Sequence, residues 1–174
     1  LELVEELEML TGNGILYNGS IHIAFNAHIV TPVHKRIDFR SEEKTNQKIG
    51  TTCKGIGPAY VDKYNRCGIR ARDLQHTGNL RKKVMDSLDL AISSGALSTS
   101  DADNLMPEIE KFLENATSIF PMVKDTFHML HKMVDNKQNI LLEGAQGTML
   151  DVNHGTYPFV TSSSPSTGGI ATGL

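Results

Sequence analysis

The pattern of apolar and polar residues predicts four helices. In each of them, apolar side chains recur every three or four positions and would line one face of a helix. The four periodic stretches are residues 1–10, 80–92, 105–113 and 118–135. Ser98 or Ser100 is a candidate N-cap for the third helix. Because a proline breaks a helix interior and suits a first turn, Pro107 predicts that this helix begins near Met106.

Short apolar runs between the helices predict strands. These runs are residues 15–17, 21–25, 28–34 and 139–143. The third run is rich in β-branched residues and enters a loop or a helix at Pro32. Strands that alternate with helices indicate an α/β fold. We therefore expect one domain over residues 1–174, with part of a mostly parallel sheet and a helical section inserted at about residues 73–136.

The stretch from Ile49 to Arg66 has an unusual composition. It holds three glycines, the adjacent Thr51 and Thr52, a proline and three basic residues. Glycines let backbone N–H groups approach a ligand closely, and threonine hydroxyls and arginine donate hydrogen bonds to phosphate oxygens. The stretch therefore predicts a loop that binds an anion, and phosphate is the anion that these groups favour. The alternative is a glycine- and proline-rich turn with solvated charges.

Composition excludes several classes of protein. With 39% hydrophobic and 21% charged residues, the 174-residue chain fits a globular protein. A net charge of -3 argues against nucleic-acid binding through bulk positive charge. No apolar run is long enough to span a membrane, and no secretory leader is expected. Cys53 and Cys67 form no disulfide framework and predict reduced thiols in a cytosolic protein.

Two histidines invite a metal-site interpretation that the sequence supports poorly. His128 and His131 are three residues apart and would share a helix face. No neighbouring cysteine or carboxylate completes a plausible ligand set, so we expect solvated helix histidines.

Two long ordered motifs resemble the adenylosuccinate synthetase family. The first reads GTT-x-K-GIGPAY-x-DK and continues through GIR to Leu74. The second reads LEGAQGTMLD from Leu142 and continues through GTYPFVTSS. The resemblance extends from about Gly14 to Leu174. It implies a parent fold like that of P-loop NTPases and a cytoplasmic homodimeric ligase. This enzyme of AMP synthesis would join IMP to L-aspartate with GTP and Mg²⁺, giving adenylosuccinate, GDP and phosphate.

The resemblance also assigns roles to four residues. Thr52 and Thr161 match threonines at the IMP phosphate, and Gln146 matches a glutamine that contacts IMP. Arg66 matches an arginine that reaches the IMP site of the neighbouring subunit. The alternatives are a surface salt bridge between Arg66 and Asp62 and a strand-end cap for Gln146.

The parts of the family that carry the chemistry have no counterpart in these residues. They are the N-terminal glycine loop with its catalytic Asp, the catalytic His, the guanine motif and the aspartate-binding loop. We therefore expect a central fragment, inactive alone, with no catalytic or metal-binding residue and with GTP and Mg²⁺ bound mainly elsewhere.

Departures from the family pattern leave two further hypotheses open. Cys53 stands where the family has glycine or a basic residue, and Ser164 stands where asparagine is usual. One hypothesis is a truncated, non-catalytic fragment that binds a nucleoside monophosphate or self-associates. The other is a diverged paralogue that binds a different monophosphate. No membrane or nucleic-acid partner is expected in either case.

Overall fold

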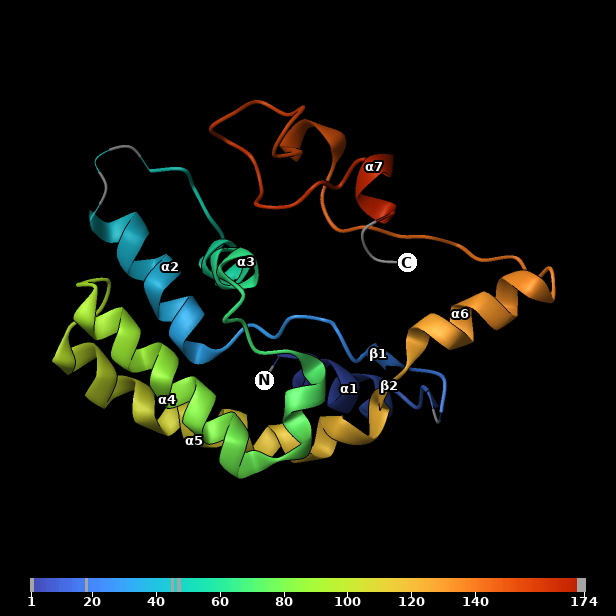
Figure 1. Cartoon of the computed structure of the whole chain (residues 1–174), viewed down its shortest axis with the longest axis horizontal. Helices are drawn as coiled ribbons and strands as arrows, with labels where there is room; N and C mark the ends of the chain where they lie inside the picture. Colours follow the sequence, from blue (N-terminus) through green and yellow to red (C-terminus); the bar gives the residue numbers. More distant parts are fainter. Residues whose placement is uncertain (1, 18, 45, 47, 172–174) are drawn as a thin grey trace.

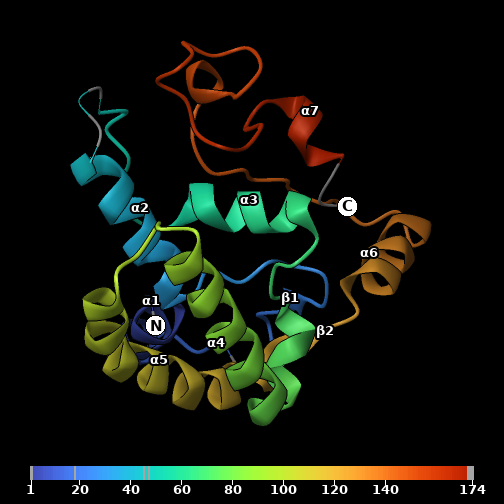
Figure 2. The same cartoon turned by 60° about the vertical axis from the view of Figure 1, so that its left-hand side comes forward.

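The structure is a computed structural model that describes residues 2–17, 19–44, 46 and 48–171. Among these residues, its elements follow in the order α1 (Glu2–Gly12), β1 (Ile23–Ala24), α2 (Pro32–Lys44), α3 (Ile56–Asn65), η1 (Ala71–Gln75), α4 (Thr77–Ser93), α5 (Thr99–Ile119), η2 (Phe120–Met122), β2 (Val123–Lys124), α6 (Thr126–Asp135), η3 (Thr148–Leu150) and α7 (Thr167–Ile170). Helices α4 and α5 lie on one side and the segment after α6 on the other, with α2 and α3 between them (Figures 1 and 2).

The core lies where α4 and α5 face α2. Leu80 and Val84 of α4, Leu105 and Ile109 of α5, and Val33 of α2 are all fully buried. The periodic stretches at residues 80–92 and 105–113 thus form helices whose apolar stripes meet, as predicted. Burying each such side chain stabilises the fold by about 1.5–3 kcal/mol. The contact among these three helices is therefore a main source of the stability of the fold.

Helix α5 begins earlier than predicted. Its N-cap is Ser98, one of the two candidates, whose hydroxyl accepts the N–H of Asp101. The predicted start near Met106 is wrong, because Pro107 lies inside the helix. Pro107 and Asp103, the residue four positions earlier, are both exposed. Water can therefore bond the Asp103 carbonyl that the proline leaves without its N–H partner.

The predicted helix at residues 118–135 is two elements. Helix α5 ends at Ile119, and Pro121 lies in the short 3-10 turn η2. The chain then forms β2, which pairs in parallel with β1 through Ile23 and Val123. Helix α6 begins only at Thr126. Proline interrupts the helical hydrogen bonds, and the pairing with β1 holds the next residues extended.

The strand predictions are confirmed only in part. Residues 21–25 contain β1, and the run at 28–34 forms a bridge at His28 before α2 begins at Pro32 as predicted. Residues 15–17 and 139–143 form no strand, and Leu16 and Leu141 are 81% and 92% exposed. A strand needs a neighbour to pair with, and no described residue pairs with these two runs. The fold is therefore helical with a small parallel sheet.

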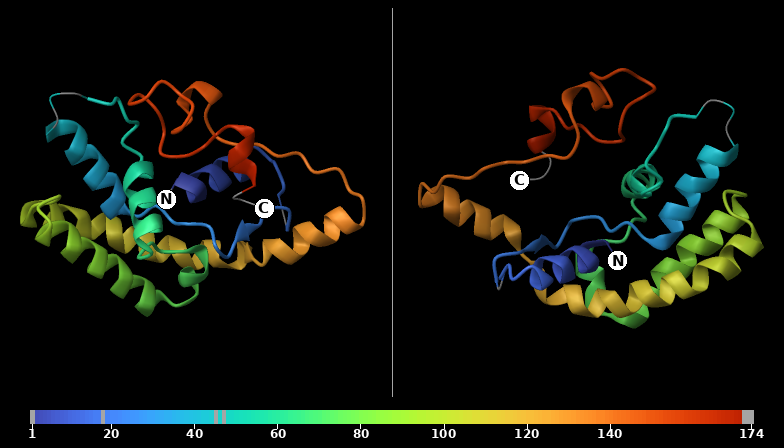
Figure 3. Two further views of the ribbon diagram at one scale, coloured as in Figure 1. Left: turned by 45° about the horizontal axis from the view of Figure 1, so that its top comes forward. Right: turned by 180° about the vertical axis from the view of Figure 1, so that it is seen from behind.

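The remaining element predictions concern the N-terminus. Helix α1 confirms the helix predicted at residues 1–10, with Leu7 buried, while Leu1 lies outside the described residues. Two further views show α1 beside the β1–β2 pair and the segment after α6 arching back over α3 (Figure 3). None of the described helices is both long and apolar enough to cross a bilayer.

Candidate functional site

The glycine-rich stretch consists of a loop and a helix. The loop ends at Gly55, and the predicted loop conformation is wrong for Ile56–Asn65, which forms α3. Gly55 has a φ of 77°, and a Cβ there would lie 2.7 Å from the backbone nitrogen of Lys35. Only glycine fits this position, because it tolerates positive φ and lacks the clashing atom. The turn at Gly55 thus aims the positive end of α3 at the loop.

Asp38 of α2 fixes the loop to the helix behind it. One carboxylate oxygen accepts the hydroxyl of Thr51 at 3.0 Å, and the other accepts the N–H of Gly55 at 2.9 Å. Asp38 belongs to the charged run from Lys35 to Lys48. It is nevertheless only 7% exposed, because the loop covers it.

A cavity of about 310 Å³ separates this loop from the segment after α6. It brings together Thr52, Gln146 and Thr161, three of the four predicted site residues. The remaining lining residues include apolar side chains from three elements or loops, which are Ile56, Leu150 and Phe159. A pocket with apolar walls and a few hydroxyl and amide donors suits a small polar ligand.

Asp151 organises the wall of the cavity that comes from the C-terminal segment. Its buried carboxylate accepts the N–H groups of Asn153 at 2.8 Å and His154 at 3.2 Å. It also accepts the hydroxyl of Ser166 at 2.7 Å and the backbone N–H of the same residue at 3.4 Å. The hydroxyl bond is the main cause that lowers the pKa of Asp151 to about 2, so this carboxylate is ionised at neutral pH.

Three site side chains have their polar groups available to a ligand. Thr161 is anchored only through its backbone, whose N–H donates to the carbonyl of Leu150 at 2.9 Å. Gln146 is exposed and has a φ of 78°, which turns the chain at the cavity. Among the described residues, none forms a hydrogen bond with the side chains of Thr52, Gln146 and Thr161.

Arg66 does not line the cavity. It caps the C-terminus of α3 with a φ of 63°, and its side chain is exposed. The alternative salt bridge with Asp62 is not formed, because the Asp62 carboxylate pairs with Nε2 of His34 at 3.0 Å. Within the described part of the chain, the Arg66 guanidinium is thus left facing solvent.

The described residues do not fit a divalent metal. They contain no group of three histidine, cysteine or carboxylate side chains close enough to hold one. His128 lies near Asp125, and His131 donates from Nδ1 to the carbonyl of Phe127. Both cysteines are free thiols, and Cys53 lies inside the glycine-rich loop.

Asp38 and Asp151 belong to the site but were not predicted from the sequence. Among the described residues, neither carboxylate forms a hydrogen bond with Thr52, Gln146 or Thr161. Asp38 also lies in a run of charged residues, which is a pattern typical of a solvated surface. Asp151 stands between the apolar residues Leu150 and Val152 within the second motif, and this is the one sequence feature that could have indicated its burial.

Comparisons with known proteins agree with the resemblance. The family profile described as adenylosuccinate synthetase matches residues 1–174. The chloroplastic adenylosuccinate synthetase of Arabidopsis thaliana is 41% identical over 177 residues, covering 99% of this chain and 35% of that protein. Adenylosuccinate synthetase from Leuconostoc citreum is 40% identical over 172 residues, covering 98% of this chain and 40% of that protein.

A solved structure gives the same result. The structure of fully ligated adenylosuccinate synthetase from Plasmodium falciparum has a TM-score of 0.76 and 30% identity, covering 88% of this chain and 36% of that chain. The chain therefore spans 35–40% of the length of the relatives described above.

Proposed function

The chain belongs to the adenylosuccinate synthetase family, and from this premise we propose that the full-length protein is a ligase that joins IMP to L-aspartate with GTP. The products are adenylosuccinate, GDP and phosphate. These 174 residues supply contacts to the IMP phosphate. The observation that carries the proposal is the cavity that gathers Thr52, Gln146 and Thr161 from distant parts of the sequence.

The donors in the cavity suit a phosphate monoester. The hydroxyls of Thr52 and Thr161 donate to phosphate oxygens, and the amide of Gln146 donates to or accepts from the nucleotide. A phosphate dianion also needs a positive charge. The lysine of the loop, Lys54, is already paired with Glu2 at 2.6 Å. Asp38 adds a negative charge to the cavity wall.

A second subunit is the proposed source of that positive charge. Arg66 is exposed and lies outside the cavity of its own chain. In a homodimer its guanidinium reaches the IMP site of the partner and grips the phosphate there. This arrangement explains why an arginine in the phosphate-binding motif does not face the cavity that the same motif lines.

The other reactants bind to parts of the protein beyond these residues. No group of three histidine, cysteine or carboxylate side chains among the described residues could hold Mg²⁺. GTP, Mg²⁺ and aspartate are therefore assigned to the remainder of the longer protein, as the 35–40% coverage of relatives allows. The proposed location is the cytoplasm, although the Arabidopsis relative is named as chloroplastic.

Calorimetric titration of IMP into the full-length protein tests the proposal. Thr52→Val removes one hydroxyl at nearly constant volume and should weaken IMP binding about tenfold. Thr117→Val is the matched control, because Thr117 is exposed on α5 away from the cavity and should leave the affinity unchanged. A wild-type protein that does not bind IMP would overturn the proposed function.

A further inference from the structure

We propose that Asp38 and Glu42 of α2 are positioning residues that set the conformation of the loop carrying Thr52. The inference deepens the proposed function and rests on it. The two residues are four positions apart on α2 and therefore share one helix face. That face is turned toward the glycine-rich loop.

Glu42 holds the beginning of the loop. One of its carboxylate oxygens accepts the N–H of Ile49 and the other accepts the N–H of Gly50, both at 3.2 Å. Gly50 has a φ of 79°, a conformation that glycine adopts readily and other residues rarely adopt. A carboxylate that accepts two consecutive backbone N–H groups fixes the direction of the peptide between them.

Asp38 holds the end of the loop in the same way. Its two oxygens accept the hydroxyl of Thr51 and the N–H of Gly55, as described above. All four carboxylate oxygens of the pair are therefore used on the loop. The donors bracket the three residues from Thr52 to Lys54. Within them the N–H of Cys53 donates to the Thr51 hydroxyl at 3.3 Å. The hydroxyl of Thr52, which lines the cavity, has no partner among the described residues.

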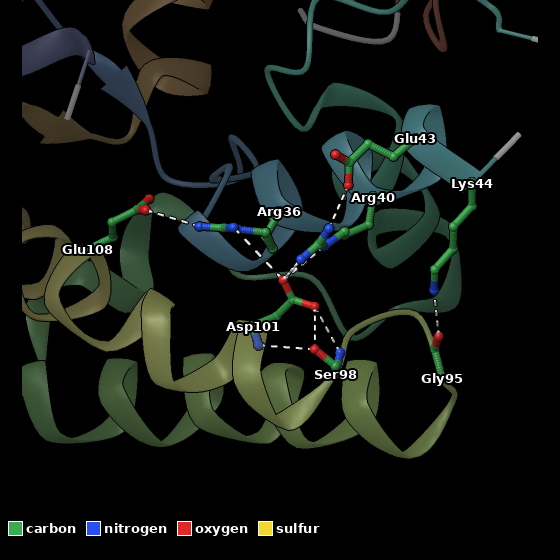
Figure 4. Close-up of polar contacts among 8 residues, drawn as sticks. All are labelled: Arg36, Arg40, Glu43, Lys44, Gly95, Ser98, Asp101 and Glu108. Atoms are coloured by element: carbon green, nitrogen blue, oxygen red, sulfur yellow. Dashed lines mark hydrogen bonds and ion pairs between the residues drawn. The ribbon is translucent and has the colours of Figure 1, made fainter.

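Helix α2 is itself braced on another face. Figure 4 shows Arg36 and Arg40 of α2 pointing at Asp101 near the start of α5. Nε and Nη2 of Arg40 donate to one oxygen of Asp101 at 2.9 and 2.7 Å, and Ser98 occupies the other oxygen. Asp101 is 3% exposed, so this ion pair is shielded on the carboxylate side. The helix that carries Asp38 and Glu42 is therefore itself tied to the start of α5.

Removing the charge of Asp38 distinguishes a positioning role from a purely electrostatic effect on the ligand. A carboxylate in the wall of a phosphate site repels the ligand, so neutralising it should tighten binding if charge alone matters. If Asp38 acts by holding the loop, Asp38→Asn should weaken binding, because an amide nitrogen cannot accept one of the two donors. The two accounts predict changes of opposite sign.

The experiment compares Asp38→Asn and Glu42→Gln in the full-length protein. The control is Glu43→Gln, which changes an exposed carboxylate of the same helix that pairs with Arg40 rather than with the loop. We expect the KM for IMP to rise about tenfold in Asp38→Asn, about threefold in Glu42→Gln and less than twofold in the control. The kcat should change less than the KM. A merely structural role would lower the melting temperature without changing the KM of the folded enzyme.

Every outcome of this comparison either supports or overturns the positioning role of Asp38 and Glu42. An unchanged or lower KM for IMP in Asp38→Asn, in a wild-type background that binds IMP, would overturn the positioning role alone. If Asp38→Asn does not fold, the half-exposed Glu42→Gln decides by the same comparison with Glu43→Gln. A wild-type protein that does not bind IMP would instead overturn the proposed function, and the inference with it.

Discussion

Buried carboxylates shape both walls of the proposed IMP cavity. Asp38 gathers donors of the glycine-rich loop, and Asp151 gathers donors of the segment that carries Thr161. Among the described residues neither carboxylate has a basic partner, and both accept hydroxyl and backbone N–H groups instead. For Asp151, the hydrogen bonds it accepts favour the ionised form of the carboxylate.

The low pKa of Asp151 predicts how stability depends on pH. Because its pKa falls from 3.8 to about 2 on folding, the ionised carboxylate stabilises the fold above about pH 4. This contribution is lost as the pH falls toward about 2. Asp151→Asn should therefore lower the melting temperature at neutral pH, and its difference from the wild type should shrink between about pH 4 and pH 2. Thermal unfolding of both proteins across this range is the measurement, and a constant difference would contradict the role of Asp151.

Gly55 gives a second prediction at the residue scale. Gly55→Ala should cost about 3 kcal/mol of unfolding free energy, because positive φ and a clash with Lys35 add together. Gly95→Ala is the matched control, with a φ of 75° and no atom within 4 Å of the added Cβ, and should cost about 1 kcal/mol. Urea unfolding measures both. An equal loss of unfolding free energy in the two variants would show that a Cβ at Gly55 does not clash with α2.

Residue roles were predictable from the sequence only where a motif carried them. Thr52, Gln146 and Thr161 were named from their motifs, and their shared cavity agrees with that choice. Their roles in binding IMP remain predictions. The burial of Asp38 was not predictable, because it depends on which face of α2 the loop covers.

At the scale of elements, helices were easier to predict than strands. The stripes of α4 and α5 are local patterns that the core confirms. Strand pairing depends on distant partners, so residues 139–143 stay unpaired despite their apolar sequence. Pro107 and Pro121 are both exposed, so exposure does not distinguish them. Helix α5 continues through Pro107 but ends before Pro121, where the β1–β2 pairing holds the next residues extended.

The bracing of α2 against α5 yields a prediction about stability. Arg40 is the main cause that holds the pKa of Asp101 well below its ordinary value. Asp101→Asn should lower the melting temperature by several degrees, because it removes the charge between the two helices and weakens the N-cap of α5. Asp86→Asn removes an exposed carboxylate paired with Lys82 and should have almost no effect. Differential scanning fluorimetry compares the two, and similar shifts would show that the brace contributes little.

At the scale of the molecule, the exposed Arg66 predicts a shared site in a homodimer. Full-length Thr52→Val and Arg66→Ala should each be impaired. A hybrid dimer would keep one site with both residues intact, so refolding an equal mixture should restore about a quarter of wild-type activity. Copurification of the two variants through different affinity tags establishes that the hybrids form. No recovery in proven hybrid dimers would place Arg66 in its own subunit's site or outside catalysis.

The formation of adenylosuccinate by the full-length protein is the decisive test of the proposed ligase activity. Purified protein would be supplied with IMP, GTP, L-aspartate and Mg²⁺, and the products separated by chromatography. We expect adenylosuccinate and GDP in equal amounts, and neither product when any substrate is omitted. The Thr52→Val protein should need a higher IMP concentration for the same rate. A folded protein that binds IMP but forms no adenylosuccinate would contradict the ligase assignment and leave a nucleotide-binding protein.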